Sequence, residues 1–513
     1  MAEISTLNGY KIKDKKAIRF YNSIADMVAD TSLKEGMHAK TKGYHTSGDG
    51  GHAEYTIVND NTLIADGGSV HDLDNGLKAT LIVENDTINS IQVGCKVNDN
   101  TFDNGIILNK ALNYCNNNHY NFLFLKGDYY ITTPVVINEK LFSIKISGMA
   151  YNGGYGTRLV YNGEGYCLTL AKGGLRYTIE KIEIECNNTS SGINCDGVIN
   201  TVINFKNYLK DITIQHAIIG MRVVSSTYTF IDNYSFGGSS NTEIGLLIEG
   251  YEFTYINNTS IDGYSNTDSN SIALKLDGGL NYYINNVDLC NFGLGKAIYL
   301  TTVSSELYTC YFNNINIIRC DGGVYFDPIN RHITSVEFNN ILFALSGINE
   351  NSHYFYSVKN DSYYAQNIKI DNVTIRNLAS TKLPNYLFEQ NTGGVVRLSI
   401  SVKDVYNAPT KTLGIKGNTY DNYTYKIYCI KQQCGKYFTA VENQRTYTFE
   451  IDYPKMENIP YIIINVRNNK DYVVNNLRYD DTTGKLKIDI IFDTAPSNNF
   501  QMFYSVMESG QNQ

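Results

Sequence analysis

The sequence predicts an all-β protein whose central part is a parallel β-helix, a solenoid of stacked coils. Three observations predict this fold: a six-residue pattern recurs along the chain, a second short strand lies between its copies, and no helical pattern separates them. One coil of this kind cannot bury its own apolar face, whereas stacked coils form long parallel sheets around a common core. We therefore expect each sheet to run through many coils.

The recurring pattern reads apolar, polar, Asn or Asp, two further residues, apolar, and its Asn or Asp positions step by 22 to 32 residues. Asn tolerates left-handed backbone angles and hydrogen-bonds within its own turn. Stacked turns would therefore align these side chains in an amide ladder, as in cross-β stacks. The copies are Leu209–Ile214, Ile231–Phe236, Ile256–Ile261, Ile284–Leu289, Phe312–Ile317, Phe338–Phe343 and Ile370–Ile375, and an upstream copy without the Asn is Ile179–Ile184.

The second strand alternates with a period of two, which indicates one buried and one exposed face. Each coil would therefore hold at least two strands. The copies of this strand are Met221–Val223, Leu246–Ile248, Leu274–Leu276, Ile298–Leu300 and Val324–Phe326.

Other regions flank the β-helix, which we place at residues 89–405. Residues 21–88 predict a small β-rich N-terminal module, because the turn-rich loop Gly43–Gly51 separates two strand-like runs. After residue 405 the period is lost, and strand-like runs joined by turn-rich loops predict a C-terminal antiparallel β-sandwich over residues 406–513.

One amphipathic helix is predicted over residues 103–118, with Asp103 or Asn104 as its N-cap. It stands where a β-helix needs its open end covered, because exposed strand edges invite aggregation. Its apolar face would hold Ile107, Ala111, Leu112 and Cys115.

Composition and charge restrict the partners. The formal charge of -8 makes nucleic acid a poor partner, because phosphates require a basic face. The 10 cysteines have no CxxC spacing and the His residues do not cluster with them, so we expect free thiols, no metal and no cofactor. No run approaches about 18 apolar residues, so we expect no membrane span. The 42 Tyr suit strands, and a Tyr ring can also stack on sugar rings.

The stretches Tyr21–Gly36 and Gly43–Tyr55, the helix at 103–118 with the following Lys126–Ile131, and the repeats resemble phage tailspike and tail-fibre depolymerases with a pectate-lyase-like fold. The resemblance covers roughly residues 20–400. The family's cap opens with a run like Gly-Asp-Gly-x-Thr-Asp-Asp, and Asn98–Asp103 departs from it.

The resemblance implies a right-handed β-helix, a homotrimer and a bacterial surface polysaccharide as ligand. It also implies that residues 1–20 attach the protein to phage tail or baseplate proteins. The protein would then be made in the host cytoplasm, reside on the virion tail and act at the outer surface of the bacterium.

Three functions follow as alternatives. The first is a tailspike that binds the polysaccharide and depolymerises it as an endo-acting glycoside hydrolase or polysaccharide lyase. The second is a receptor-binding tail protein that recognises the glycan without cleaving it. The third is a structural spike whose recognition surface lies in the C-terminal domain.

Two pairs of carboxylates are candidate catalytic residues, because glycoside cleavage needs an acid and a base or nucleophile at a set separation. Glu249 and Asp277 would be neighbours on adjacent second strands, roughly 5 Å apart, as a retaining pair requires. Asp262 and Asp288 would lie one coil and two positions apart, roughly 8 Å between Cα atoms, which fits an inverting pair. Outward carboxylates are also ordinary on a solvated sheet, and that interpretation stays open.

Candidate substrate-binding residues lie on the same second strands. The mixture of cations, aromatic rings and acids is what an oligosaccharide site needs. For a lyase, Lys275 would be the base and Asp277 a calcium ligand. The predicted binding residues are Arg222, Lys275, Tyr299, Tyr325 and Asp327.

Overall fold

The computed structural model forms two compact units, Met1–Asn241 and Thr242–Gln513. Most of residues 1–20 and much of residues 406–513 lie outside the described residues. The structure describes residues 6–7, 10–11, 18–137, 143–149, 156–171, 176–196, 198–199, 202–203, 206–224, 227–250, 252–264, 268–345, 353–358, 362–376, 386–390, 396–406, 414–416, 434–438, 446–451, 461–467, 472–480, 482–483, 485–492 and 500–507.

A five-stranded sheet opens the first unit, in the order β3-β4-β5-β7-β6. Strands β3 and β4 are parallel and the other pairs are antiparallel. The helix α1 is capped at Ser23, whose hydroxyl accepts a hydrogen bond from the backbone N–H of Asp26. A separate two-stranded sheet pairs β1 (Thr6–Leu7) with β2 (Tyr10–Lys11). The elements are β3 (Ile18–Tyr21), α1 (Ile24–Val28), β4 (His38–Thr41), β5 (Ala53–Val58), β6 (Val70–Asp72) and β7 (Lys78–Ile82).

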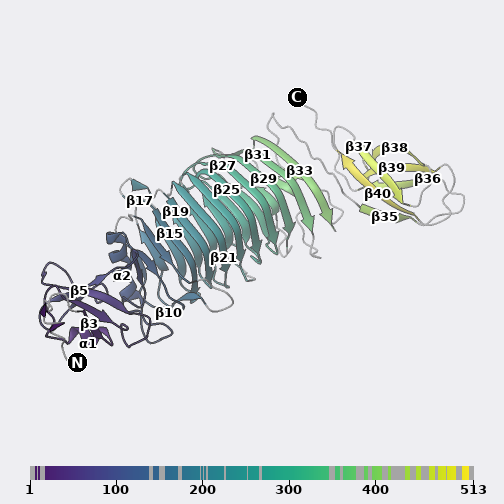
Figure 1. The fold of residues 1–513 in the computed structure, drawn as a ribbon. Helices are drawn as coiled ribbons and strands as arrows, with labels where there is room; N and C mark the ends of the chain where they lie inside the picture. Colours follow the sequence, from purple (N-terminus) through teal and green to yellow (C-terminus); the bar gives the residue numbers. More distant parts are fainter. Residues whose placement is uncertain are drawn as a thin grey trace. The chain divides into compact units, whose positions relative to one another are not determined.

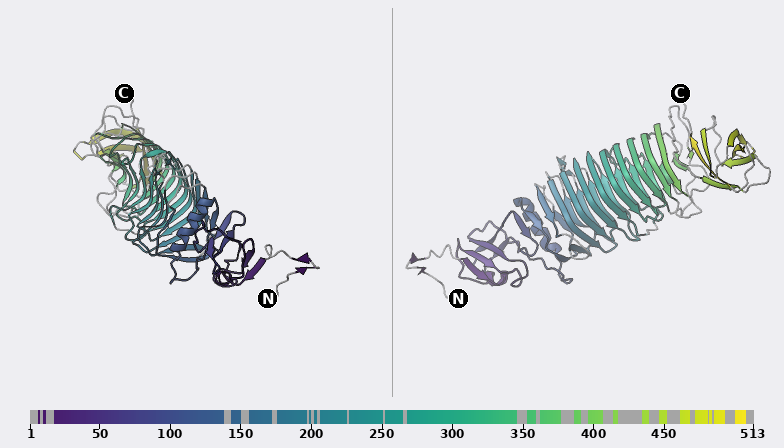
Figure 2. Two further views of the ribbon diagram at one scale, coloured as in Figure 1. Left: turned by 90° about the vertical axis from the view of Figure 1, so that its left-hand side faces the viewer. Right: turned by 45° about the vertical axis from the view of Figure 1, so that its right-hand side comes forward.

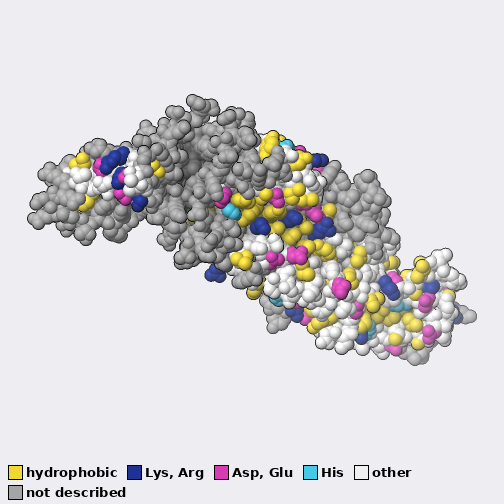
Figure 3. All heavy atoms as spheres, turned by 180° about the vertical axis from the view of Figure 1, so that it is seen from behind, with side chains coloured by type: hydrophobic (Ala, Val, Ile, Leu, Met, Phe, Trp, Pro, Cys, Tyr) yellow, Lys and Arg dark blue, Asp and Glu magenta, His cyan; other side chains and the backbone are white. Residues whose placement is uncertain are grey.

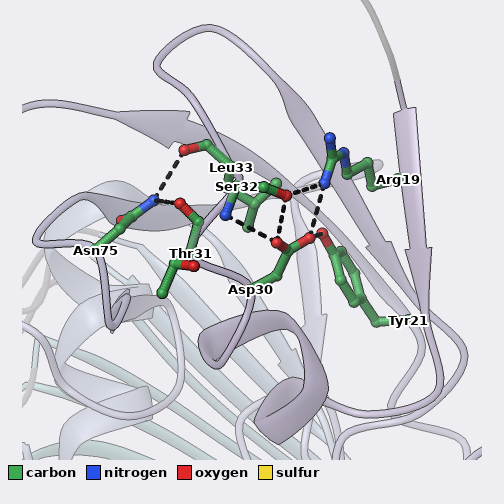
Figure 4. Close-up of polar contacts among 7 residues, drawn as sticks. All are labelled: Arg19, Tyr21, Asp30, Thr31, Ser32, Leu33 and Asn75. Carbon is green, nitrogen blue, oxygen red and sulfur yellow. Dashed lines mark hydrogen bonds and ion pairs between the residues drawn. The ribbon is translucent and has the colours of Figure 1, made fainter. Parts of the chain in front are cut away.

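Asp30 ties β3 to the turn that follows α1 (Figure 4). Its carboxylate accepts hydrogen bonds from Tyr21 Oη at 2.6 Å, Arg19 Nη1 at 3.0 Å and the Ser32 backbone N at 2.9 Å. Partial burial raises the pKa of Asp30, but the hydrogen bonds from Ser32, Tyr21 and Arg19 outweigh it and hold the pKa well below its usual range. The ionised carboxylate therefore stabilises the module.

Replacing Asp30 by Asn is expected to lower the free energy of unfolding of the first unit by roughly 1–2 kcal/mol at neutral pH, the low end for charged hydrogen bonds because the site is partly solvated. A depressed folded-state pKa contributes stability that is complete above the ordinary carboxyl pKa, about 4, and is lost as the pH falls below it. Thermal unfolding of both proteins from about pH 7 to about pH 3 should show the difference shrinking. Asp74→Asn, at an exposed carboxylate, is the control; a difference that stays constant with pH would contradict the assignment.

The rest of the first unit is a parallel β-solenoid, as the sequence predicts (Figures 1 and 2). Its strands form two parallel sheets, which we call the long ladder and the short ladder after the length of their strands. The long ladder runs in the order β8-β9-β12-β15-β19-β21; in addition, β13 pairs with β15 and β10 pairs with β13. The short ladder runs in the order β11-β14-β16-β20. The strands are β8 (Thr87–Asn89), β9 (Asn121–Leu123), β10 (Gly127–Ile131), β11 (Val135–Ile137), β12 (Ile144–Ser147), β13 (Thr157–Tyr161), β14 (Tyr166–Ala171), β15 (Arg176–Cys186), β16 (Ser191–Asp196), β19 (Lys206–Gln215), β20 (Ile219–Val224) and β21 (Tyr228–Gly237), with a small hairpin of β17 (Val198–Ile199) and β18 (Val202–Ile203).

The predicted helix is α2 (Gly105–Asn118), at the start of this stack. Asn109 and Asn113 bind the edge strand β11: Asn109 Oδ1 accepts from Val136 N at 2.7 Å, and Asn113 Nδ2 donates to Val136 O at 3.0 Å. These bonds satisfy backbone groups that an open end would leave unpaired. The predicted N-cap is confirmed at Asn104, and the carboxylate of Asp103 accepts a hydrogen bond from the Gly105 N–H at 2.9 Å. One detail differs from the prediction: Leu108 rather than Ile107 is buried.

The second unit is also a parallel β-solenoid with a long and a short ladder. Its long ladder is β23-β25-β27-β29-β31-β33 and its short ladder is β22-β24-β26-β28-β30-β32-β34, all parallel (Figure 1). The strands are β22 (Ile244–Glu249), β23 (Phe253–Asp262), β24 (Ile272–Asp277), β25 (Gly279–Cys290), β26 (Lys296–Thr301), β27 (Leu307–Ile318), β28 (Gly322–Asp327), β29 (Ile333–Ala344), β30 (His353–Ser357), β31 (Ala365–Arg376), β32 (Tyr386–Gln390), β33 (Val396–Tyr406) and β34 (Gly414–Lys416).

The long strands β19, β21, β23, β25, β27, β29 and β31 bend at the predicted Asn or Asp, which takes a left-handed conformation. Asn286 and Asn314 have φ of 54° and 56°, and Lys181, in the copy without Asn, has φ 59°. The amide ladder is confirmed: Asn286 donates to Asn258 at 3.2 Å, Asn314 to Asn286 at 3.0 Å and Asn340 to Asn314 at 3.1 Å. The ladder position therefore bends each of these strands, and β25, β27, β29 and β31 carry a second left-handed residue five positions earlier, at Asn281, Thr309, Ser335 and Asn367.

Two three-stranded antiparallel sheets, β35-β40-β37 and β36-β39-β38, follow in the second unit. The homotrimer and the C-terminal β-sandwich stay predictions. The eight cysteines for which the structure describes the side chain are free, and all but Cys290 are buried. The strands are β35 (Cys434–Phe438), β36 (Thr446–Ile451), β37 (Tyr461–Arg467), β38 (Tyr472–Asp480), β39 (Lys485–Phe492) and β40 (Phe500–Met507).

Candidate functional site

A column of tyrosines crosses the exposed face of the short ladder in the second unit. Lys275 pairs with Tyr299, Tyr299 with Tyr325, Tyr325 with Tyr356, and Tyr356 with Glu389. Neighbouring leucine and isoleucine positions such as Ile298 point into the core, so the alternation of the strands turns these side chains outward. We call Tyr299, Tyr325 and Tyr356 the tyrosine column.

Two lysines lie over these rings. Lys296 Nζ is 5.8 Å from the ring centroid of Tyr299 and 5.5 Å from that of Tyr325, and Lys275 Nζ is 6.0 Å from that of Tyr299. At these distances the ammonium groups are attracted to the aromatic faces. Burial lowers the pKa of Lys296, although Asp268 and Asp327 oppose this shift. The face therefore presents cations and aromatic rings together.

Gly322 makes room for the column. A Cβ atom at this position would stand 2.6 Å from the ring of Tyr325, so the ring lies against the bare backbone of Gly322. On the strand that follows, His353 stacks on Tyr356 with ring centroids 4.2 Å apart, and its Nδ1 is 3.1 Å from Glu389 Oε2. The aromatic surface thus extends over three coils and ends at an acid.

Asp327, the last residue of β28, is an acid on this face. The hydroxyl of Tyr299 donates a hydrogen bond to its carboxylate. Burial and the neighbouring Asp327 raise the pKa of Tyr299, so this phenol keeps its proton. The arrangement couples an aromatic ring to a partly exposed carboxylate.

The register places Glu249 and Asp277 side by side, as predicted: Leu247 pairs with Lys275 and Ile248 with Leu276, so the next positions are Glu249 and Asp277. Asp277 is only 4% exposed. Its two oxygens accept hydrogen bonds from the backbone N and the Oγ of Ser304, both at 3.0 Å. In this conformation Asp277 fixes the loop after β26, and the catalytic role of the pair stays a prediction.

Asp262 and Asp288 also take the predicted register, since Asp288 pairs with Ser260 and Asp262 with Cys290. They lie on the long strands, on a different face from the tyrosine column. Asp262 accepts hydrogen bonds from Asn291 Nδ2 at 3.0 and 3.1 Å, and Asp288 accepts one from Asn316 Nδ2 at 2.7 Å. Asp262 is thus bonded to the residue that directly follows β25, and Asp288 is bonded to its register partner in the next coil.

Arg222 belongs to the first unit, where it pairs with Asn194 across β16 and β20. Four of the five predicted binding residues therefore lie on one face of the second unit, namely Lys275, Tyr299, Tyr325 and Asp327. The residue that pairs with Lys275 on the preceding short strand is Leu247.

Sequence reasoning missed Lys296, His353 and Tyr356. Lys296 opens β26, outside the three-residue pattern that marked this strand. Tyr356 lies between Phe355 and Ser357, and the polar Ser357 broke the apolar alternation that had identified the earlier copies. Extending the Ile298–Leu300 pattern by two positions upstream would have found Lys296, and allowing a polar third position would have found Phe355–Ser357, with Tyr356 inside it and His353 two positions before it.

Over the described surface seen from behind, hydrophobic side chains, which here include Tyr, are mixed with Lys, Arg, Asp and Glu (Figure 3). Among the described residues, no group of three or more His, Cys, Asp or Glu side chains is placed to hold a metal ion. In the same part of the chain no helix is long and apolar enough to cross a membrane.

No family model matches the sequence, and no curated protein matches it. The structure is similar to the tailspike gp42 of Acinetobacter phage vb_AbaP_AS12, with 14% identity, 80% of this chain and 75% of that chain covered, and a TM-score of 0.49. It is also similar to the tailspike gp49 of Acinetobacter baumannii bacteriophage Fri1, a capsular polysaccharide depolymerase, with 10% identity, coverages of 96% and 98%, and a TM-score of 0.43. A third similar structure is WceF of Pantoea stewartii, a glycan biofilm modifying enzyme, with 13% identity, coverages of 97% and 73%, and a TM-score of 0.44. At these identities the likeness concerns the fold.

Proposed function

We propose that this protein is a phage tailspike that binds a bacterial surface polysaccharide through the tyrosine column and depolymerises it. The single observation that carries the binding function is the row of outward tyrosines flanked by Lys275 and Lys296. Flat rings pack against sugar rings while their hydroxyl groups form hydrogen bonds, and the lysines favour polymers with acidic sugars. The sequence resemblance and the parallel β-solenoid support the tailspike assignment.

The N-terminal segment attaches the proposed tailspike to the phage tail, and a homotrimer would carry three such faces. Three weak sugar sites on one rigid particle bind a repetitive polymer far more strongly than one site. The protein would act on the outer surface of the bacterium, where the polymer lies.

Cleavage is tested by polymer length. The purified protein is incubated with a panel of bacterial capsular and wall polysaccharides, and chain length is followed by size exclusion with mass spectrometry of the fragments. Defined oligosaccharides establish a depolymerase, and an unsaturated terminal sugar identifies a lyase rather than a hydrolase. Intact polymer that co-elutes with the protein would restrict the function to binding.

Replacing Tyr325 by Ala is expected to weaken polysaccharide binding about tenfold, because an aromatic contact and its buried area together contribute about 1–2 kcal/mol. The ring lies in the middle of the column, between Tyr299 and Tyr356. The matched control is Tyr308→Ala, at a tyrosine on a long strand that is 44% exposed. Binding isotherms that are unchanged by Tyr325→Ala, or equally weakened by both substitutions, would exclude the tyrosine column.

A further inference from the structure

A second polar cluster lies on the outer face of the first unit, where β10, β13, β15 and β19 are adjacent. Asp128 pairs with Arg158, Arg158 with Glu183, and Glu183 with Thr213. Glu185 lies two positions further along the same strand as Glu183, and the alternation of the strand turns both side chains outward. Two carboxyl groups therefore share one face, with Cα atoms roughly 6.7 Å apart.

Glu183 is only 7% exposed although it faces outward, and unlike the buried Asp277 it has a carboxyl oxygen without a hydrogen-bond partner. Its Oε2 atom is buried and has no hydrogen-bond partner. Burial raises the pKa of Glu183; the guanidinium of Arg158 opposes this, and the charges of Glu185 and Asp128 add to it. A buried carboxyl with an unused oxygen holds its proton more readily than an exposed one, as a general acid must.

Glu185 has a contrasting environment. Its Oε1 is 2.6 Å from Nδ1 of His216, and its register partner is Gln215. His216 holds a left-handed backbone conformation, with φ 53°, at the end of β19, which turns its ring back toward Glu185. Gln215 in turn lies over Gly237, where a Cβ atom would meet the Gln215 Oε1 at 2.0 Å. Glu185 is thus oriented by a second group, as a catalytic base is.

Arg158 completes the cluster. It binds Asp128 through two parallel hydrogen bonds, Nε to Oδ1 at 3.0 Å and Nη2 to Oδ2 at 2.6 Å. This fork holds the guanidinium next to Glu183 in the column, and the Arg158 side chain remains 39% exposed. An exposed, fixed guanidinium can bind the hydroxyl or carboxylate groups of a sugar.

We propose that Glu183 and Glu185 are the acid and the base of a glycoside hydrolase site for the bacterial surface polysaccharide, with His216 and Arg158 as positioning residues. The inference rests on the proposed function and assigns residues to its cleavage step. Glu183 gives its proton to the glycosidic oxygen as the bond from that oxygen to the anomeric carbon breaks. A water molecule attacks the anomeric carbon and gives its proton to Glu185, so one water is consumed and two chain ends result. A Cα spacing of roughly 6.7 Å between two side chains on one strand face leaves room for a water molecule between the carboxyl groups, as an inverting mechanism requires.

The experiment uses the full chain and the same polysaccharide panel, with release of reducing ends as the readout of cleavage. E183Q and E185Q are each expected to lower kcat by about 100-fold or more, the range for removing a general acid or base, with polysaccharide binding unchanged. The matched control E180Q lies in the same strand beyond the bend at Lys181, where Glu180 is 2.8 Å from Lys145, and it should retain full activity.

Thermal unfolding separates catalysis from a structural role. Because the folded state favours the protonated form of Glu183, ionisation at neutral pH lowers stability, and E183Q removes that effect. The melting temperature of E183Q at neutral pH should therefore equal or exceed that of the wild type. A lower melting temperature accompanied by lost activity would assign Glu183 to the architecture and overturn the proposal.

Two outcomes distinguish this inference from the proposed function. If the wild type binds a polysaccharide of the panel and releases no reducing ends, the acid–base pair is refuted while the binding function stands. If it neither binds nor cleaves, the proposed function fails as well. Wild-type cleavage that survives in both E183Q and E185Q would place the catalytic residues elsewhere.

Discussion

Replacing Phe338 by Ala is expected to lower the free energy of unfolding of the second unit by about 3–5 kcal/mol, the range for removing a buried phenylalanine. Phe338 is fully buried and lies at the centre of an aromatic core. Its ring stacks on Phe312 with centroids 4.4 Å apart, and the rings of Phe355 and Phe326 meet it edge-on at 5.5 and 6.3 Å. Neighbouring coils hold these rings in register, so they cannot move inward to fill the cavity.

Chemical unfolding followed by circular dichroism measures this loss, since a β-sheet signal reports the solenoid directly. The control is Leu280→Ala, at a long-strand residue that is 38% exposed, where a change within about 0.5 kcal/mol is expected. A loss below about 1 kcal/mol for Phe338→Ala would mean that the coils relax around the cavity, contrary to a rigid stack.

Replacing Asn314 by Val is expected to destabilise the second unit by about 2–4 kcal/mol, because it combines backbone strain with the loss of two hydrogen bonds. Asn314 has φ 56°, a conformation that a β-branched residue strongly disfavours. Its side chain donates to Asn286 at 3.0 Å and accepts from Asn340 at 3.1 Å, so it connects two neighbouring coils.

Asn314→Gly separates the two contributions, because glycine adopts this backbone without strain and removes only the amide bonds. We expect Gly to cost about 1 kcal/mol, clearly less than Val, in the same unfolding measurement. Equal losses for Gly and Val would show that the amide ladder dominates, and no loss for either would remove the ladder from the account of stability.

The sequence predicted correctly which strand positions the candidate acids pair with, but it did not predict which groups surround their carboxylates. The repeats alone gave the pairing of Asp288 with Ser260 and the position of Glu249 beside Asp277. They gave no indication that Ser304 in the following loop binds both oxygens of Asp277. In the upstream copy Ile179–Ile184 the alternation of the strand turns Glu183 outward, and the burial of Glu183 comes only with the packing of neighbouring coils.

The sequence by itself determined the parallel β-solenoid, the bends at the Asn positions and the outward tyrosines. These features depend on local requirements, namely a period of two in strands and a residue that accepts a left-handed backbone, and each coil repeats them. The tertiary structure alone decided which outward carboxylates are bound, exposed or buried. That outcome depends on loops of unequal length and on side chains from adjacent coils, such as Arg158 beside Glu183 and His216 against Glu185, whose contacts leave no periodic mark in the sequence.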